Sequence, residues 1–155
     1  MKRKRAPRSK TTDPLLPSLP CACSSVRRAA RAVTQLYEEE LRPTGLRVTQ
    51  FTLLMALEHA GVSTQGDLGC ALALDSTTLT RMLKLLDKEG WIRSMPGSDR
   101  RERHLSLTTA GRRKLAQSLK QWEQAQTRLR NLLGEAQWKA LNTTFDTIAQ
   151  AAQTA

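Results

Sequence analysis

Apolar residues recur at helical spacing through the first half of the chain. From Ser24 they follow the i, i+3, i+4, i+7 pattern of an amphipathic helix, which Pro43 and Gly45 end. Thr49 is placed to cap a second helix, which runs to Gly61. The opening pattern therefore predicts two successive helices.

Two shorter helices follow, each with a start signal. Thr64 is expected to cap the third and Asp75 the fourth, because their side-chain oxygens can accept hydrogen bonds from free helix N–H groups. On the fourth helix, leucines and a methionine share one face, while threonine, arginine and lysine side chains share the other. This helix is expected to pack on the domain with one side and to expose the polar side.

The apolar period then changes from helical to alternating. Residues 91–95 and 103–107 are predicted strands, joined by a tight turn over 96–99. Thr108 is expected to cap a long helix, and a last helical stripe follows Gly134. The pattern therefore predicts a β-hairpin between two groups of helices.

This order of elements predicts a mainly α fold with a small β-wing. A winged helix-turn-helix core over 46–108 is flanked by N- and C-terminal helices over 24–42 and 112–152. Their apolar stripes are too long for so small a core to cover, so they are expected to form the interface of a homodimer. Residues 1–20 are rich in Lys, Arg and Pro and are expected to be a disordered basic arm. Residues 21–155 are expected to form one domain.

Positive charge is concentrated in two places. The chain has a net charge of +11; residues 1–20 hold six Lys/Arg against one Asp, and residues 81–114 hold ten against four acids. Clustered positive charge attracts a polyphosphate partner such as DNA. No run approaches the roughly 18 apolar residues of a membrane span. Together with three cysteines and no secretion signal, this predicts a cytoplasmic protein of a bacterial or archaeal cytosol, nucleoid-associated and without a membrane partner.

The polar face of the fourth helix suits a DNA groove. Thr77, Thr80, Arg81 and Lys84 recur at helical spacing, so short hydroxyls and long cations could contact base edges and phosphates. An ordinary amphipathic surface helix would show the same alternation. The neighbouring hairpin therefore carries the distinction.

The hairpin gathers arginines at or just after its turn. Arg100, Arg101 and Arg103 could project into a narrow minor groove, which attracts guanidinium groups. Asp99 could hold one of them in an extended pose. A polar helix beside a basic hairpin therefore favours a nucleic-acid reader.

Three stretches in this order resemble the MarR family of bacterial winged helix-turn-helix regulators. They read GLRVTQFTLLMAL (45–57), LDSTTLTRMLKLLDKEGWI (74–92) and DRRERHLSLTTAG (99–111). Residues from about 24 to 150 fit the family's order of elements. The resemblance implies a homodimer with two wings and two recognition helices on a pseudo-palindromic operator in double-stranded DNA.

The resemblance also assigns roles to residues. Arg101 matches the wing arginine of the minor groove, Asp99 its supporting partner, and Gln65 a residue that contacts the DNA backbone. Thr108 and Gly111 match structural positions for a helix start and close packing. The positions that match major-groove contacts are Ser76, Thr77, Thr78, Thr80, Arg81 and Lys84.

The family resemblance further implies a regulator that small, often aromatic or phenolic, acids release from DNA. Arg27, Arg28 and Arg31 are adjacent on the first helix and could pair with the carboxylate of such an effector. Arginines in this arrangement also serve as a solvated face or pair with acids of another helix. We expect a repressor that a small aromatic carboxylate or phenolic effector releases from a palindromic operator.

The cysteines suggest a second signal. Cys21 and Cys23 are expected just before the first helix, where the organic-hydroperoxide branch of the family has its reactive cysteine, and Cys23 is the better match. Tyr37 is the only tyrosine, whereas that branch uses several. Inert thiols are an alternative; a metal site that also used Cys70 or His59 would lack a full ligand set. Cys70 is expected to be buried in the third helix.

Catalysis and cofactors are not expected. His59 and His104 are the only histidines, and neither paired carboxylates on one face nor a glycine-rich phosphate loop is present. The basic arm leaves a nonspecific architectural DNA-binding protein as an alternative to a regulator.

Overall fold

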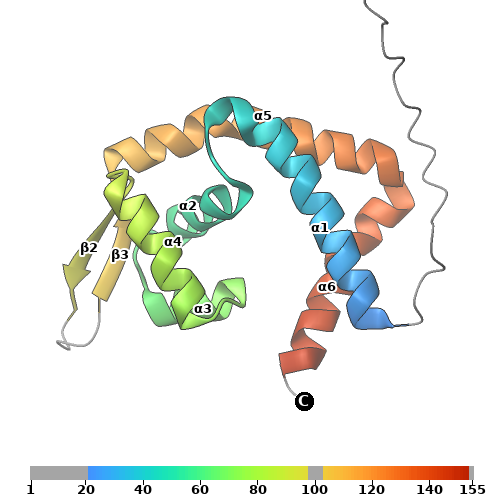
Figure 1. Ribbon diagram of the computed structural model, residues 1–155, viewed down its shortest axis with the longest axis horizontal. Helices are drawn as coiled ribbons and strands as arrows, with labels where there is room; N and C mark the ends of the chain where they lie inside the picture. Colours follow the sequence, from blue (N-terminus) through green and yellow to red (C-terminus); the bar gives the residue numbers. More distant parts are fainter. Residues whose placement is uncertain (1–20, 98–102, 154–155) are drawn as a thin grey trace, which may run out of the picture.

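The computed structural model describes residues 21–97 and 103–153. The chain forms a mainly helical fold with one small sheet, as predicted, and α5 crosses the molecule from the sheet at one end to α6 at the other (Figure 1). The elements are α1 (Ala22–Leu41), η1 (Arg42–Thr44), α2 (Val48–Ala60), β1 (Ser63–Thr64), α3 (Gln65–Leu72), α4 (Ser76–Lys88), β2 (Ile92–Pro96), β3 (Arg103–Leu107), α5 (Thr109–Leu133) and α6 (Glu135–Gln153).

The sheet contains three antiparallel strands in the order β1-β3-β2. β2 pairs with β3 from Ile92 opposite Leu107 onward, and these two strands form the predicted hairpin. β1 pairs Thr64 with His104 on the other side of β3. This strand was not predicted, because two residues are too few to show an alternating pattern.

Three predicted helix starts are confirmed by side-chain caps. Each cap satisfies a backbone N–H that has no partner inside its own helix. Thr64 Oγ1 accepts from the Asp67 N–H at 3.1 Å, Asp75 Oδ1 from the Thr78 N–H at 2.9 Å, and Thr108 Oγ1 from the Gly111 N–H at 3.0 Å.

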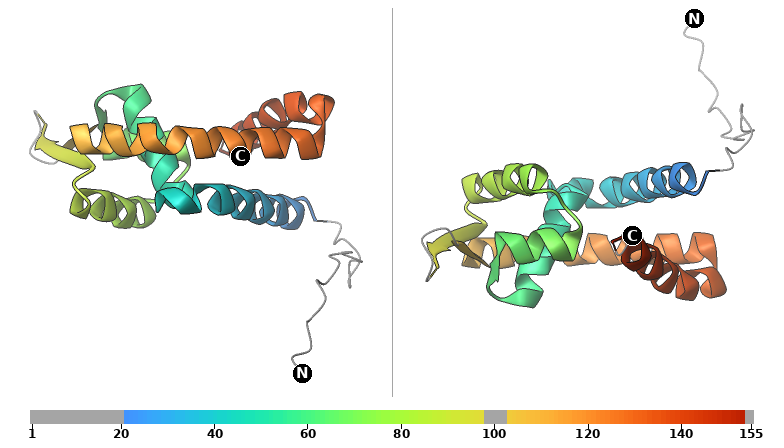
Figure 2. Two further views of the ribbon diagram at one scale, coloured as in Figure 1. Left: turned by 90° about the horizontal axis from the view of Figure 1, so that it is seen from above. Right: turned by 90° about the horizontal axis from the view of Figure 1, so that it is seen from below.

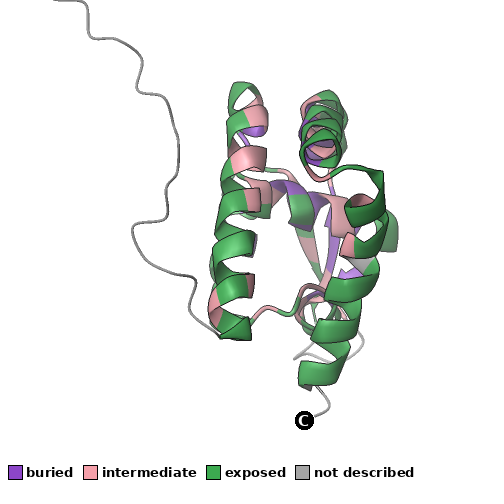
Figure 3. Cartoon of the chain, turned by 90° about the vertical axis from the view of Figure 1, so that its right-hand side faces the viewer, coloured by how far each residue is buried: buried purple, intermediate pink, exposed green. Residues whose placement is uncertain are grey.

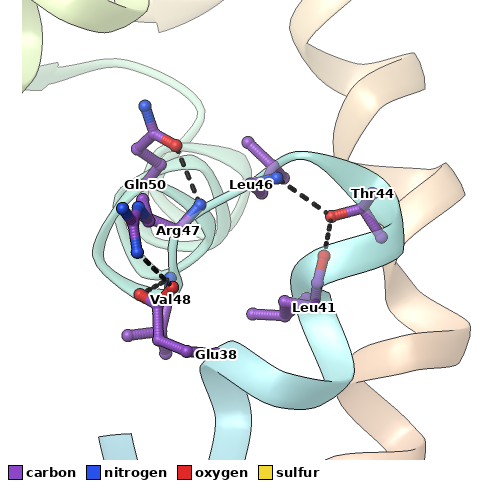
Figure 4. A network of polar contacts seen from close by, with 7 residues as sticks. All are labelled: Glu38, Leu41, Thr44, Leu46, Arg47, Val48 and Gln50. Carbon is purple, nitrogen blue, oxygen red and sulfur yellow. Dashed lines mark hydrogen bonds and ion pairs between the residues drawn. The ribbon is translucent and has the colours of Figure 1, made fainter. Parts of the chain in front are cut away.

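The prediction for the start of α2 was wrong. Thr49 is the second residue of that helix, which begins at Val48 with Arg47 in the N-cap position. The capping acceptor comes instead from α1: Glu38 Oε1 accepts the Val48 N–H at 3.0 Å (Figure 4). Gln50 Oε1 accepts the Arg47 N–H at 2.9 Å. A carboxylate from another helix therefore supplements the local capping contact of Gln50.

The cysteines also differ from expectation. Cys21 holds the N-cap position of α1, so Cys23 lies inside the first turn and not before the helix. Cys70 is exposed, although burial was expected. α3 buries Leu68 instead, and Cys70 lies two residues further along, on another face of this short helix.

Residues of the helices α1 to α5 and of the strands β2 and β3 build the hydrophobic core. Leucines from α1, α2, α3, α4 and β3 are buried around Phe51, which stacks on Trp122 of α5 with ring centroids 6.0 Å apart. Each such leucine contributes about 1.5–3 kcal/mol when fully buried. Among the side chains whose burial the structure describes, no core residue lies on α6, and most of α1 and α6 is exposed (Figure 3). The helices α1 and α6 therefore leave apolar surface uncovered.

The start of α5 packs closely on the chain that enters β2. Thr108 Oγ1–H donates to the Gly90 carbonyl at 2.7 Å, and the Thr108 N–H donates to the Trp91 carbonyl at 3.0 Å. A Cβ at Gly111 would lie 2.0 Å from the Trp91 oxygen, so only glycine fits there. The expected structural roles of Thr108 and Gly111 are confirmed. None of the helices in the described ranges combines the length and the hydrophobicity of a membrane span.

Candidate nucleic-acid interface

The recognition-helix candidate α4 has the two faces that its pattern predicts. Leu79, Leu83 and Leu86 are buried against the core. The opposite face carries three exposed side chains, Thr77, Arg81 and Lys84, and a half-buried one, Thr80. The helix α4 lies at the same end of the molecule as the β2–β3 hairpin (Figure 1).

The first turn of α4 is organised around its capping carboxylate. Ser76, Thr77 and Thr78 are all exposed there. The Thr78 Oγ1–H donates to Asp75 Oδ2 at 2.6 Å, so this hydroxyl already has an acceptor within the cap. Hydrogen bonds from the Thr78 hydroxyl and N–H hold the pKa of Asp75 below its usual range. Thr77 therefore has the freer hydroxyl for an outside contact.

Gln65 lies where α3 meets α4. It is the first residue of α3, and its Nε2–H donates to Thr80 Oγ1 at 2.8 Å. The hydrogen bond joins the two helices of the helix-turn-helix through side chains. Sequence reasoning assigned Gln65 to the DNA backbone and missed this contact.

The hairpin brings one predicted arginine beside α4. Arg103 is exposed, and its Nε–H donates to Ser94 Oγ at 2.6 Å across the β2–β3 pair. Ser94 was not singled out from the sequence, because a lone serine in a strand carries no signal. The predicted residues Asp99, Arg100 and Arg101 lie outside the described residues.

Helix and hairpin share one open cavity. It has a volume of about 310 Å³, and its lining includes Lys84 of α4 and Arg103 of β3 together with Gln65 and Thr80. Two cations from separate elements therefore line one cavity, together with the carboxylate of Asp87. A phosphate-rich ligand lying across α4 and the wing would contact both.

The candidate effector residues lie far from this surface, on α1. Arg27, Arg28 and Arg31 are exposed, and none of them lines the cavity of about 560 Å³ that α1, α5 and α6 enclose. That cavity is mainly apolar, and Tyr37 contributes a hydroxyl that donates to Gln126 Oε1 at 2.8 Å. Burial raises the pKa of Tyr37. Sequence reasoning missed this cavity, because it depends on how three helices cross.

The thiols show no built metal site. Cys21, Cys23 and Cys70 are free and exposed. Within the described part of the chain, no group of three or more His, Cys, Asp or Glu residues could hold a metal ion.

A helix-turn-helix followed by a basic β-hairpin defines a winged helix-turn-helix protein. A family model described as the MarR family matches residues 46–102, from the start of α2 into the wing. The DNA complex of the M. tuberculosis transcriptional regulator MosR is 34% identical with a TM-score of 0.79, and the match covers 86% of this chain and 97% of that one. The chain belongs to the MarR family.

Other relatives agree with this assignment. The transcriptional repressor CouR, in a structure bound to a 23-mer DNA duplex, is 28% identical with a TM-score of 0.76, covering 83% of this chain and 92% of that one. The HTH-type transcriptional regulator YwoH of Bacillus subtilis is 32% identical over 89 residues, which are 57% of this chain and 65% of that protein. The chain thus matches slightly less than two thirds of this curated relative. All three are described as regulators of transcription, which agrees with the expectation that the chain is not an enzyme.

Proposed function

We propose that the protein is a homodimeric, DNA-binding transcriptional repressor that a small aromatic acid releases from a palindromic operator. The observation that carries the proposal is that Lys84, on the polar face of α4, and Arg103 of the hairpin line one surface cavity, in a chain of the MarR family. In this proposal α4 enters the major groove and the wing reaches the adjacent minor groove.

The proposed contacts divide by role. Thr77, Thr80 and Arg81 face base edges, while Lys84 and Arg103 neutralise phosphates. Asp99, Arg100 and Arg101 are assigned to the wing tip on the family resemblance. DNA complexes of the relatives MosR and CouR support duplex DNA as the partner.

Footprinting and binding on the DNA upstream of the gene test this proposal. The wild-type protein should protect a discrete palindrome, and its affinity should fall steeply with salt because counterions are released. Arg81→Ala should weaken binding by about 1–3 kcal/mol and relax the base preference at its position, whereas Lys84→Ala should weaken binding about equally on all sequences and reduce the salt slope by about 1. Coating without register would favour the architectural alternative, and wild-type affinity in both variants would refute the groove assignment.

The effector proposal rests on the free charges of α1. Within the described residues, Arg27, Arg28 and Arg31 are exposed and form no ion pair, so their guanidinium groups are open to a carboxylate or phenolic ligand. An effector that binds the DNA-incompetent dimer more tightly would lower operator affinity by that difference.

A thiol signal is the second candidate, because Cys21 and Cys23 are exposed together at the start of α1. Wild type and a Cys21→Ser/Cys23→Ser variant are titrated on labelled operator with benzoates and pyridine carboxylates, then with organic hydroperoxide. Release by carboxylates in both proteins supports the arginine site. Release by hydroperoxide alone, lost in the double variant and reversed by reductant, would make Cys23 the sensor instead.

A further inference from the structure

The hydroxyl of Thr80 is held differently from several other helical hydroxyls. Those of Thr52, Ser118 and Thr147 each donate to the carbonyl oxygen four residues earlier, at 2.9, 2.9 and 2.8 Å. This is a common resting place for a helical hydroxyl proton. Thr80 makes no such bond in the described part of the chain, and its one hydrogen bond comes from Gln65 Nε2–H at 2.8 Å.

That bond fixes which part of the hydroxyl is free. A threonine hydroxyl has one proton to donate and two lone pairs to accept with. Gln65 occupies a lone pair, so the proton of Thr80 is left without an acceptor. Thr80 is half-buried on the polar face of α4, one residue from Arg81. A ligand on this face therefore meets Thr80 as a hydrogen-bond donor.

We propose that Gln65 is a positioning residue that sets Thr80 as a donor, so that α4 selects a base with a major-groove acceptor and rejects cytosine at that position. Guanine offers N7 and O6, adenine N7 and thymine O4, whereas cytosine offers only its N4 amino donor. The inference rests on the proposed function and adds a rule of sequence preference. Loss of one such hydrogen bond should change relative affinity about two- to tenfold.

The experiment is selection of full-length protein on a duplex with a randomised half-site. Thr80→Val removes the hydroxyl at nearly constant shape and identifies the base position that depends on Thr80. Thr52→Val is the matched control, because Thr52 is an exposed helical threonine on α2, and its variant should select the wild-type sequence. Gln65→Met keeps the length of the side chain without its N–H, and should lose the preference at the position that Thr80→Val identifies.

Gln65→Glu supplies the sharper arm. An ionised carboxylate only accepts hydrogen bonds, so it would take the Thr80 proton and leave the hydroxyl lone pairs facing the DNA. Overall affinity should fall because a negative charge approaches the phosphates. The preference at the identified position should turn toward donor edges, which are cytosine N4 and adenine N6.

Three outcomes would overturn the inference. A Gln65→Glu variant that keeps the wild-type preference would mean that Thr80 donates to Gln65. A Gln65→Met variant that loses affinity equally for all sequences would make Gln65 a structural brace only. Selection of no discrete sequence by the wild type would refute the proposed function and this inference with it.

Discussion

At the scale of single residues, Gly111 sets the join between α5 and the chain entering the wing. The Trp91 oxygen that a Cβ would meet at 2.0 Å belongs to the backbone, so it cannot swing away as a side chain would. Gly111→Ala should lower the free energy of unfolding by at least about 2 kcal/mol, at the upper end of overpacking costs. Urea denaturation measures this change.

Gly66→Ala is the matched control for that substitution. Gly66 lies in α3, where a Cβ would have its nearest neighbour at an ordinary 3.7 Å. Alanine there should leave the stability unchanged or raise it by about 0.5–1 kcal/mol, because glycine disfavours helices. Equal losses in both variants would contradict the packing argument at Gly111.

At the scale of elements, α1 is tied to α2 by one carboxylate. Glu38 accepts the Val48 N–H at 3.0 Å and the Arg47 Nη1–H at 3.2 Å (Figure 4). Glu38→Ala should cost about 1 kcal/mol, the typical value of a lost helix cap. Glu38→Gln should cost less, because its amide oxygen can still cap and the Arg47 ion pair is largely solvated. Thermal unfolding of the two variants tests the order, and equal losses would mean that the ion pair dominates.

The caps of α3 and α4 also make the helix-turn-helix sensitive to acid. Hydrogen bonds from Thr64 and Thr78 lower the pKa values of Asp67 and Asp75 below the ordinary 3.8. Because the folded values lie below the unfolded ones, this contribution to stability is present above pH 3.8 and is lost as the pH falls through the folded values. The urea midpoint should therefore drop in that range.

An Asp67→Asn/Asp75→Asn double variant separates these caps from other acids. At Asp75, the N-cap of α4, asparagine caps about as well as aspartate, and at Asp67, the third residue of α3, its amide oxygen can still accept from Thr64; neither amide titrates. The urea midpoint of the double variant should decline less than that of the wild type between pH 5 and pH 3. Parallel declines would assign the acid sensitivity to other carboxylates.

Elements whose signals are local in sequence could be predicted, and contacts set by helix crossing could not. The caps Thr64, Asp75 and Thr108 act on residues three positions away, so their sequence reveals them. Glu38 caps a helix that begins ten residues later, and Gln65 meets Thr80 across the angle between two helices. The faces of α4 followed from periodicity, whereas the cavity among α1, α5 and α6 required three helix positions at once.

At the scale of the whole molecule, the end opposite the wing has exposed apolar side chains on two helices. Leu132, Phe145 and Ile148 are 69%, 40% and 43% exposed on α5 and α6. Viewed from above and below, α1 and α6 both lie at this end (Figure 2). Sedimentation should give twice the mass of 17.3 kDa, because a second copy would cover this surface.

Charge substitutions locate that interface. A Phe145→Asp/Ile148→Asp variant should sediment as a monomer, because two carboxylates would enter an apolar contact. Leu85→Asp changes an apolar residue of α4 that is 53% exposed, and this control should remain dimeric. A wild-type monomer, or a dimeric double variant, would contradict the proposed interface.

Thr64 links β1 to α3, and this link limits how far the end of the molecule proposed to contact DNA can change shape. Its backbone pairs with His104 in β3, and its side chain caps α3, which Gln65 joins to α4. The wing and α4 should therefore move as one rigid unit, with a fixed distance between them. Because this unit does not change shape on binding, the DNA has to bend or twist to fit it. The free-energy cost of that deformation depends on the base sequence. We therefore compare operators with identical contacted bases. Those with flexible pyrimidine–purine steps between the groove contacted by α4 and the groove contacted by the wing should bind more tightly than those with stiff steps there.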